Sequence, residues 1–284
     1  MLRRIILATD FSTRSDRLLL RSKLIARETG AEIVLVHVVD DQQPERLLAP
    51  AMMEARALLC ETANTLREED GLTATFTVKA SDISAGILAA ADEAEADLIM
   101  LGSPRNRAFG TFPGRTVERV LRGAAKPILI ALTPPTAPYG RSLLAMDFDD
   151  ASQAAARAAL SLGIFDRLQV TIMHAVDPVA EGHLRRSLVG EDAIASYRTD
   201  QRESASLQLK EEVEGLGLPS ASTRAVTMIG SPARTILEAA KAEGAELVIM
   251  GTSQRKGLAR ILIGSVAADM IRDSERDLLI VPVD

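Results

Sequence analysis

Short apolar runs alternate with longer stretches of helical spacing along the chain. We expect strands over Arg4 to Thr9, Glu32 to Val38, Thr73 to Lys79, Asp97 to Leu101 and Pro127 to Leu132. A second set covers Ser142 to Met146, Gln169 to His174, Ser222 to Met228, Glu246 to Met250 and Asp277 to Pro282. Because these runs are apolar at nearly every position, they are typical of parallel strands covered on both faces.

The stretches between the apolar runs predict helices. In the first part of the chain they are Thr13 to Thr29, Glu45 to Glu69, Ile83 to Glu95 and Arg115 to Arg122. Ser12 is a favourable N-cap for the first helix, and Gly30 is a favourable terminator. The alternation of strands and helices predicts an α/β fold, with a parallel sheet, helices on both faces and right-handed crossovers.

The whole pattern occurs twice in the same order. Leu7-Ala8-Thr9-Asp10-Phe11 recurs as Leu144-Ala145-Met146-Asp147-Phe148, and Val120-Leu121-Arg122 recurs as Met270-Ile271-Arg272. Prolines in the segment from Thr133 to Pro138 favour an extended linker between the copies. We therefore predict two tandem doubly wound domains, residues 1–138 and 139–284, each with a five-stranded parallel sheet.

Composition agrees with this organisation and excludes several classes of protein. A length of 284 residues suits two domains, and 47% hydrophobic with 25% charged residues is typical of a globular protein. The net charge of −6, an aromatic content of 3% and the absence of Trp argue against a nucleic-acid partner. The single Cys60 cannot form an internal disulfide, and no apolar stretch is long enough to cross a membrane. We expect a cytoplasmic protein.

Ligands of doubly wound sheets bind at the carboxyl ends of the strands. Asp10 and Asp147 follow the first strand of each copy, and Gly102 and Gly251 follow the fourth. A carboxylate at this edge could accept hydrogen bonds from a ribose or an adenine amine. The alternative is that each aspartate only caps or solvates its own loop.

The segment from Gly251 to Ser265 has the features of a phosphate site. It follows a strand and ends in Gly264-Ser265, where the helical stretch from Val266 to Arg272 begins. Backbone amides at such a helix start can hold phosphates, with the Ser265 hydroxyl as a further donor and Arg255 or Lys256 adding positive charge. It is not a Walker loop, because the Gly-Lys-Ser/Thr triplet is absent. A simple tight turn is the alternative.

Other chemistry-bearing residues have structural interpretations. We expect His37 and His174, which lie at strand ends, to be packed and hydrogen-bonded rather than catalytic, and we expect Cys60 to be buried beside Leu58 and Leu59. The stretch Arg198 to Glu214 predicts the solvated face of an amphipathic helix. Asp147, Asp149 and Asp150 resemble a response-regulator magnesium pocket, which also requires an aspartate after the third strand; the second copy has Met228-Ile229-Gly230 there. We identify no catalytic group or metal cluster.

Together these residues resemble tandem universal stress proteins. The resemblance rests on the ends of three strands in each half. The first strand ends in Ala-Thr-Asp or Ala-Met-Asp, the second in His-Val-Val-Asp or His-Ala-Val-Asp, and the fourth in Leu-Gly-Ser or Met-Gly-Thr. The family's nucleotide-binding members have Gly-x2-Gly-x9-Gly-Ser/Thr after strand four. In the second half Gly251, Gly264 and Ser265 match, but Gln254 replaces the middle glycine. In the first half Gly102 and Gly114 remain, whereas Arg105 and Arg115 replace the middle glycine and the serine.

The resemblance implies a Rossmann-like fold of the adenine nucleotide alpha hydrolase type and binding of ATP or another adenine nucleotide, with or without magnesium. The residues that it implies in the second half are Asp147, Val176, Met250, Gly251, Ser253, Gln254, Gly264, Ser265 and Val266. Asp147 would lie near base and ribose, Val176 at the adenine, and the glycines, Ser265 and Val266 around the phosphates. Gln254 could intrude on the phosphate path. The degenerate first site comprises Asp10, Gly102, Arg105, Gly114 and Arg115, whose arginines could fill the phosphate position themselves.

We therefore expect a regulatory stress protein that binds nucleotide mainly in its second half. By resemblance, the last strands of the two halves would pair edge to edge and form an internal pseudo-dimer; a homodimer of the whole chain is a further possible assembly. Two alternatives stay open: a nucleotide-independent platform for protein interactions, and a slow ATPase.

Overall fold

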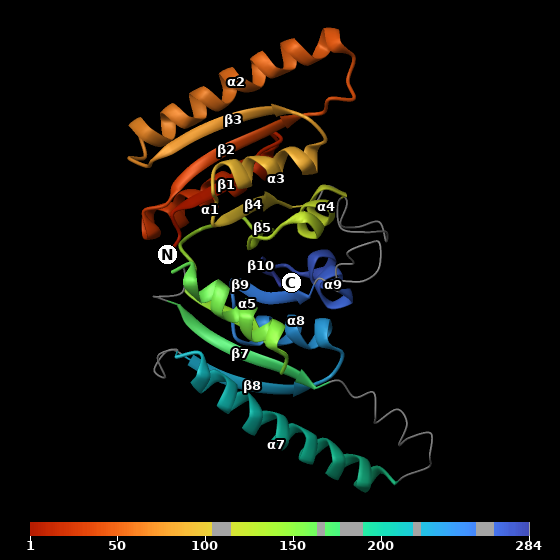
Figure 1. The fold of residues 1–284 in the computed structure, drawn as a ribbon. Helices are drawn as coiled ribbons and strands as arrows, with labels where there is room; N and C mark the ends of the chain where they lie inside the picture. The colour runs from red at the N-terminus through yellow and green to blue at the C-terminus, as the bar shows by residue number, and fades with distance from the viewer. Residues whose placement is uncertain (104–114, 164–167, 177–189, 218–222, 254–263, 284) are drawn as a thin grey trace.

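The computed structural model describes residues 1–103, 115–163, 168–176, 190–217, 223–253 and 264–283. In this part of the chain, ten strands form one continuous sheet in the order β3-β2-β1-β4-β5-β10-β9-β6-β7-β8 (Figure 1). Strands of the first half are parallel to one another, as are those of the second half, and β5 and β10 are antiparallel. The predicted α/β fold, with five parallel strands in each half, is therefore confirmed, and the two sets of strands join through β5 and β10 into one sheet.

The strands are β1 (Arg4–Ala8), β2 (Glu32–Val39), β3 (Ala74–Ala80), β4 (Leu98–Gly102), β5 (Ile128–Ala131), β6 (Arg141–Ala145), β7 (Gln169–Val176), β8 (Thr223–Ile229), β9 (Leu247–Ser253) and β10 (Asp277–Val283). The helices are α1 (Thr13–Thr29), α2 (Glu45–Glu68), α3 (Ile83–Glu93), α4 (Arg115–Gly123), α5 (Asp150–Ser161), α7 (Glu191–Gly215), α8 (Pro232–Ala242) and α9 (Ser265–Asp273). Each predicted strand and helix is present, with its ends displaced by only a few residues.

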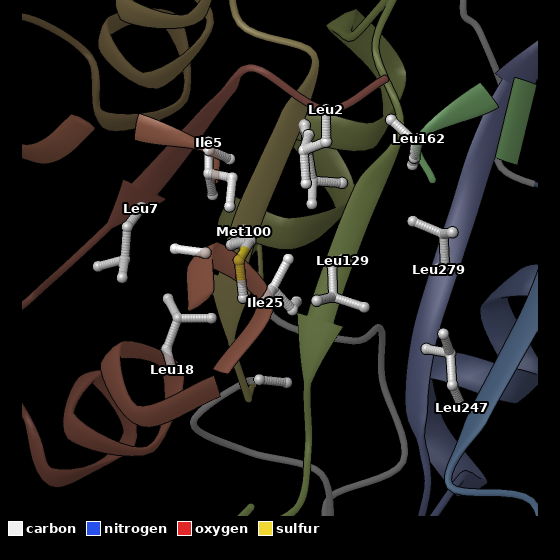
Figure 2. Close-up of a cluster of buried hydrophobic side chains, with 14 of the residues drawn as sticks. Leu2, Ile5, Leu7, Leu18, Ile25, Met100, Leu129, Leu162, Leu247 and Leu279 are labelled. Atoms are coloured by element: carbon white, nitrogen blue, oxygen red, sulfur yellow. The ribbon is translucent and has the colours of Figure 1, made fainter. Parts of the chain in front are cut away.

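Helices cover both faces of the sheet and enclose one apolar core on each face. Side chains of α1, α2, α5 and α7 contribute to one core, and those of α3, α4, α8 and α9 contribute to the other. Both cores continue across the junction between the halves: Leu129 and Leu279, from β5 and β10, belong to the same cluster (Figure 2). The two halves consequently share their interior instead of folding as separate units joined by a linker.

The junction itself is the edge-to-edge pairing that was expected of the last strands. Leu278, Leu279 and Ile280 pair with Ile130, Leu129 and Ile128, respectively. This contact covers two strand edges that would otherwise present unpaired backbone groups. The two halves thus form an internal pseudo-dimer.

The ends of α1 follow the prediction in part. Gly30 terminates the helix in the left-handed conformation, with a φ of 74°, and its N–H donates to the carbonyl oxygen of Ala26 at 2.8 Å. Ser12 occupies the N-cap position, but its side chain makes no capping hydrogen bond. The Ser12 hydroxyl donates instead to the carboxylate of Asp10.

The expected burial of Cys60 is wrong, because its side chain is exposed. The buried face of α2 is formed by Ala55, Leu59, Ala63 and Leu66, which recur every three or four residues. Consecutive helical residues are rotated by about 100°, so Cys60 turns away from the core that Leu59 enters. Leu58 is exposed for the same reason.

The charged stretch from Arg198 to Glu214 lies within α7, and nearly all of its charged side chains are exposed. Ile194, Ala205 and Leu209 are the buried residues that attach α7 to the sheet. The predicted solvated helix face is therefore confirmed. None of the helices in the described part of the chain is long and apolar enough to span a membrane.

Candidate functional site

Each half has a point where the strand order reverses, and the carboxyl ends of the strands converge there. In the first half β1 lies between β2 and β4, and in the second half β6 lies between β7 and β9. Asp10 and Asp147 lie two residues after the ends of β1 and β6. Both aspartates consequently lie at the crevice where doubly wound sheets bind their ligands.

The two histidines are packed and hydrogen-bonded, as the sequence indicated. His37 contacts the carbonyl oxygen of Thr9 through Nδ1 at 2.8 Å, and His174 contacts that of Met146 at 3.0 Å. Since a carbonyl oxygen only accepts, Nδ1 must carry a hydrogen in both rings. Each histidine therefore fixes the chain immediately before the aspartate.

Sequence reasoning missed an aromatic ring above each histidine. Phe11 stacks on His37 with a centroid distance of 4.5 Å, and Phe148 stacks on His174 at 3.9 Å. Phe11 adopts a φ of 56°, and its N–H donates to the Thr9 hydroxyl at 3.0 Å. The available signal was that a phenylalanine follows the aspartate in both copies.

The carboxylate of Asp10 is occupied by groups of its own loop. Its Oδ1 accepts hydrogen bonds from Ser12 N at 3.1 Å and from the Ser15 hydroxyl at 2.8 Å, in addition to the Ser12 hydroxyl. Arg14 Nη2 lies 3.5 Å from its Oδ2. The contacts of Asp10 therefore agree with the alternative that this carboxylate stabilises its own loop, which leads into α1.

Asp147 has a more open carboxylate than Asp10. Its Oδ1 accepts from Phe148 N at 2.9 Å and lies 3.8 Å from His174 Nδ1. The side chain is 78% exposed, compared with 45% for Asp10. The cause is a pair of replacements within the loop. Asp149 and Ala151 replace Ser12 and Arg14, and Asp149 caps α5, accepting a hydrogen bond from Ser152 N at 2.7 Å.

A pocket of about 530 Å³ opens at the crevice of the first half. The ends of β1, β2 and β4 and the beginnings of α3 and α4 form its walls. Its apolar lining includes Val36, Val38, Val39, Ile87, Leu101 and Val117. Its polar lining includes Asp10, Arg14, Ser15, Gln43, Ser103 and Thr116. Gly102 lies in this wall, and so does Val39, the counterpart of Val176 in the other half.

In the second half, Val176 ends β7, and Met250, Gly251 and Ser253 lie in the last part of β9. Met250 pairs with Ala145 of β6, which places the end of β9 beside the strand that leads to Asp147. The carbonyl oxygen of Val176 accepts a hydrogen bond from Gly230 N, just after β8, at 3.0 Å.

The start of α9 is the second part of the predicted phosphate site. Gly264 occupies the N-cap, Ser265 is the first helical residue and Val266 the second. Gly264 and Ser265 are exposed, and Gly264 has no side chain with which to cap the helix. Gly264 therefore does not cap the first amides of α9, and amides at such a helix start can be satisfied by water or an anionic ligand.

Several predicted site residues lie outside the described part of the chain. Arg105, Gly114 and Gln254 belong to this group. The side chains of Arg115, at the start of α4, and of Ser253, at the end of β9, are likewise not described. Their roles stay predictions.

Comparison with known proteins places the chain in a family. The Universal stress protein family matches residues 1–131 and 138–282, one match for each half. A universal stress protein of Methanocaldococcus jannaschii is 22% identical over 156 residues, which span 50% of this chain and 94% of the relative. One from Synechocystis is 28% identical over 151 residues, spanning 50% of this chain and 97% of the relative.

Solved structures show the same tandem fold. The crystal structure of a universal stress protein from Archaeoglobus fulgidus superposes with a TM-score of 0.73 at 20% identity, covering 98% of both chains. A putative universal stress protein from Pseudomonas aeruginosa has a TM-score of 0.71 at 20% identity, covering 99% of this chain and 93% of that one. The chain belongs to the universal stress protein family and carries two of its domains in tandem.

Proposed function

We propose that this stress-response protein binds ATP or a related adenine nucleotide, mainly in its second half. The observation that carries the proposal is the open carboxylate of Asp147, whose side chain is 78% exposed at the carboxyl edge of the sheet. Its counterpart Asp10 is held by Ser12, Ser15 and Arg14. The second half also retains Gly264 and Ser265 at the start of α9.

Different residues would serve the different parts of the nucleotide. The Asp147 carboxylate is suited to accept hydrogen bonds from ribose hydroxyls or an adenine amine. The first amides of α9 and the Ser265 hydroxyl are suited to the phosphates. No group of three or more His, Cys, Asp or Glu is placed for a metal in the part of the chain that the structure describes. Any magnesium would enter together with the phosphates.

The first half supports a second candidate, a smaller ligand without phosphates. Its pocket of about 530 Å³ has mainly apolar walls, and Asp10 is already engaged there. Arg115 stands at the position of Ser265, so the serine hydroxyl that would bind a phosphate is missing. Calorimetry with adenine, adenosine and ATP on protein stripped of nucleotide would test this, since the first half should prefer the phosphate-free compounds.

The primary experiment is to denature the purified protein and to quantify the small molecules released. About one adenine nucleotide per chain supports binding mainly in the second half. About two per chain would contradict the asymmetry between the halves. None, together with no binding of added ATP, would favour the nucleotide-independent interaction platform.

Gly264→Val tests the phosphate site directly. Gly264 has a φ of −56°, and a Cβ there would meet no atom within 4 Å, so the fold should tolerate the substitution. We expect calorimetric binding of ATP to be lost, because the side chain would occupy the space in front of the α9 amides. Gly114→Val, the counterpart in the first half, should leave binding unchanged. Equal losses from both variants would refute assignment of the site to the second half.

We assign no catalytic residue. We propose that ATP hydrolysis is slow, and a stoichiometry of bound nucleotide that stays unchanged over hours would support a sensing role over an ATPase.

A further inference from the structure

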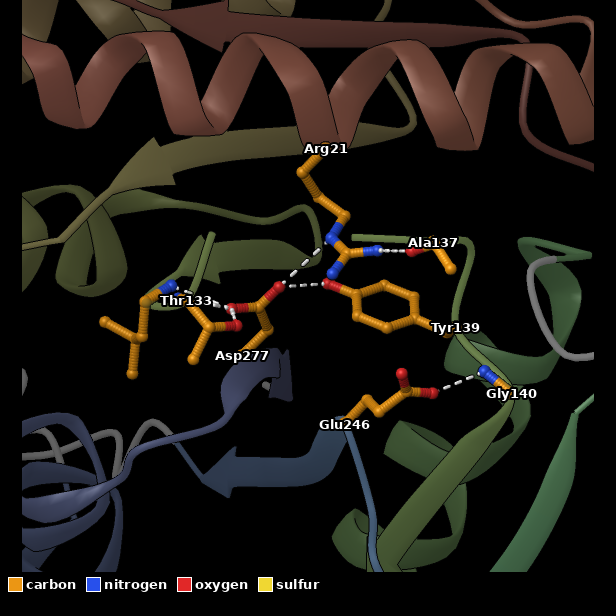
Figure 3. A network of polar contacts seen from close by, with 8 residues as sticks. Arg21, Thr133, Ala137, Tyr139, Gly140, Glu246 and Asp277 are labelled. Atoms are coloured by element: carbon orange, nitrogen blue, oxygen red, sulfur yellow. Dashed lines mark hydrogen bonds and ion pairs between the residues drawn. The ribbon is translucent and has the colours of Figure 1, made fainter. Parts of the chain in front are cut away.

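A fully buried carboxylate connects the two halves of the chain. Asp277 begins β10 and has no exposed surface. It accepts hydrogen bonds from Leu132 N at 2.8 Å and from both the N–H and the hydroxyl of Thr133 at 3.0 Å (Figure 3). Tyr139 donates its hydroxyl to Asp277 at 2.6 Å. These donors belong to the segment that leaves β5 and leads into the second half.

Arg21 supplies the compensating positive charge from the first half. It extends from α1, is 4% exposed, and its Nε lies 3.2 Å from Asp277 Oδ2. Its guanidinium lies 3.8 Å above the ring of Tyr139, and Nη1 donates to the carbonyl oxygen of Ala137 at 2.9 Å. Because each charge has a partner and further hydrogen bonds, the network avoids the cost of an isolated buried ion.

Among the described residues, the pseudo-symmetric corner of the molecule has no such network. Aligning Val120-Leu121-Arg122 with Met270-Ile271-Arg272 places Pro127 at the position of Asp277 and Pro282 at that of Leu132. Aligning the Asp10 and Asp147 motifs places Ala158 at the position of Arg21 and Leu2 at that of Tyr139. The carboxylate, its donors and the guanidinium are thus confined to one side of the β5–β10 pair.

This asymmetry distinguishes between alternative strand pairings. Leu278, Leu279 and Ile280 of β10 pair with Ile130, Leu129 and Ile128 of β5. Because both edges are apolar, these contacts alone do not favour β5–β10 pairing over pairing of two identical edges. Two copies of the chain could therefore pair β5 with β5, or β10 with β10, in the same antiparallel manner.

Either of these pairings would leave polar groups without partners. In a β10–β10 pair, Asp277 would meet Pro282, which has no N–H, and Val283, which has no hydroxyl. In a β5–β5 pair, the amides of Leu132 and Thr133 would meet Pro127 and find no carboxylate. Buried polar groups left in this state are costly.

We infer that the network of Asp277, Arg21, Thr133 and Tyr139 selects pairing of β5 with β10 over pairing of like edges between two copies of this chain. The β5 edge of the first half thereby prefers the β10 edge of the second half to the β5 edge of another copy. The mechanism is discrimination by unpaired polar groups in the wrong complexes, in addition to the favourable contacts in the right one.

The test is co-refolding of two full-length forms, one of which carries an affinity tag. The forms are mixed, unfolded in denaturant and refolded together at high protein concentration, and the untagged chain captured with the tagged one is measured. The control is the same mixture without unfolding, in which captured untagged chain measures association between copies that are already folded. For the wild type, the amount of untagged chain captured should be equal with and without unfolding.

The decisive variant is Arg21→Met with Asp277→Leu, which removes the network without leaving an unpaired charge. We expect capture after co-refolding to exceed that of the wild type at least threefold. The matched control is Arg224→Met with Glu243→Leu, which removes an ion pair at the outer strand β8, away from the junction, and should behave as the wild type.

A folded Arg21→Met/Asp277→Leu variant that exchanges no more than the wild type would overturn the inference. If that variant does not fold, Thr133→Val with Tyr139→Phe decides the question. It keeps the ion pair and removes two hydroxyl donors, and it should raise exchange by a smaller factor. Unchanged exchange in this folded variant would overturn the inference equally.

Discussion

Burial raises the pKa of the Tyr139 phenol well above its ordinary value of 10.0, and the negative charge of Asp277 raises it further. A group whose pKa is higher in the folded state holds its proton more tightly there. Its contribution to stability is complete below pH 10 and is lost as the pH rises towards the folded-state pKa. The network at the junction should consequently weaken in alkali.

Tyr139→Phe should separate the hydrogen bond from this alkaline effect. The variant loses a donor to a buried carboxylate, and we expect the free energy of unfolding at pH 7 to fall by about 1.5 to 3 kcal/mol. It also lacks the titrating phenol, so its stability should decline less than that of the wild type above pH 10. Urea unfolding from pH 7 to 11 measures both effects, and parallel alkaline slopes would contradict the assignment.

Neighbouring residues of α2 differ in the surface that they contact. Leu59 is 1% exposed in the core beneath the helix, whereas Cys60 is exposed. Leu59→Ala should lower the free energy of unfolding by about 2 to 5 kcal/mol, since it creates a cavity among packed side chains. Cys60→Ala, the matched control one position along, should change it by less than about 0.5 kcal/mol. Equal effects in urea unfolding would mean that the orientation of α2 is wrong.

Elements were predictable from the sequence where a single periodicity decides them. Strands such as β2 are covered on both faces, so that nearly every residue is apolar and the run itself marks the strand. For Cys60 the local run of Leu58 and Leu59 was misleading. Only the spacing of Ala55, Leu59 and Ala63 along the whole helix indicates which face is buried.

The candidate site was predictable to the same extent. The repeated strand ends located Asp10, Asp147 and both histidines, because strand ends of a doubly wound sheet share one edge. The sequence did not reveal that Ser12 and Arg14 contact the carboxylate of Asp10, whereas the residues at their positions in the second half leave the carboxylate of Asp147 exposed. That difference depends on side-chain contacts within a loop, which no periodicity encodes.

The molecule as a whole has one continuous sheet and two cores that cross the junction between its halves. Separate domains joined by a linker commonly unfold in separate steps. Here, loss of either half would expose the β5–β10 edge, the shared core residues Leu129 and Leu279, and the buried charges of Arg21 and Asp277. The cost of that exposure should couple the two halves.

We therefore expect a single unfolding transition in calorimetry, with the calorimetric and van't Hoff enthalpies equal. Leu129→Ala in β5 should shift this one transition to lower temperature without splitting it, because the cavity lies in the shared core.

Under the proposed function, nucleotide binding to the second half should also stabilise the first half. ATP at 100 times its dissociation constant should stabilise the chain by about 2.7 kcal/mol. Slow amides of β2 in the first half should gain the same protection from hydrogen exchange as those of β7, although the nucleotide would contact only the second half. Two resolved transitions, or protection confined to β6 to β9, would show that the halves unfold independently despite their common sheet.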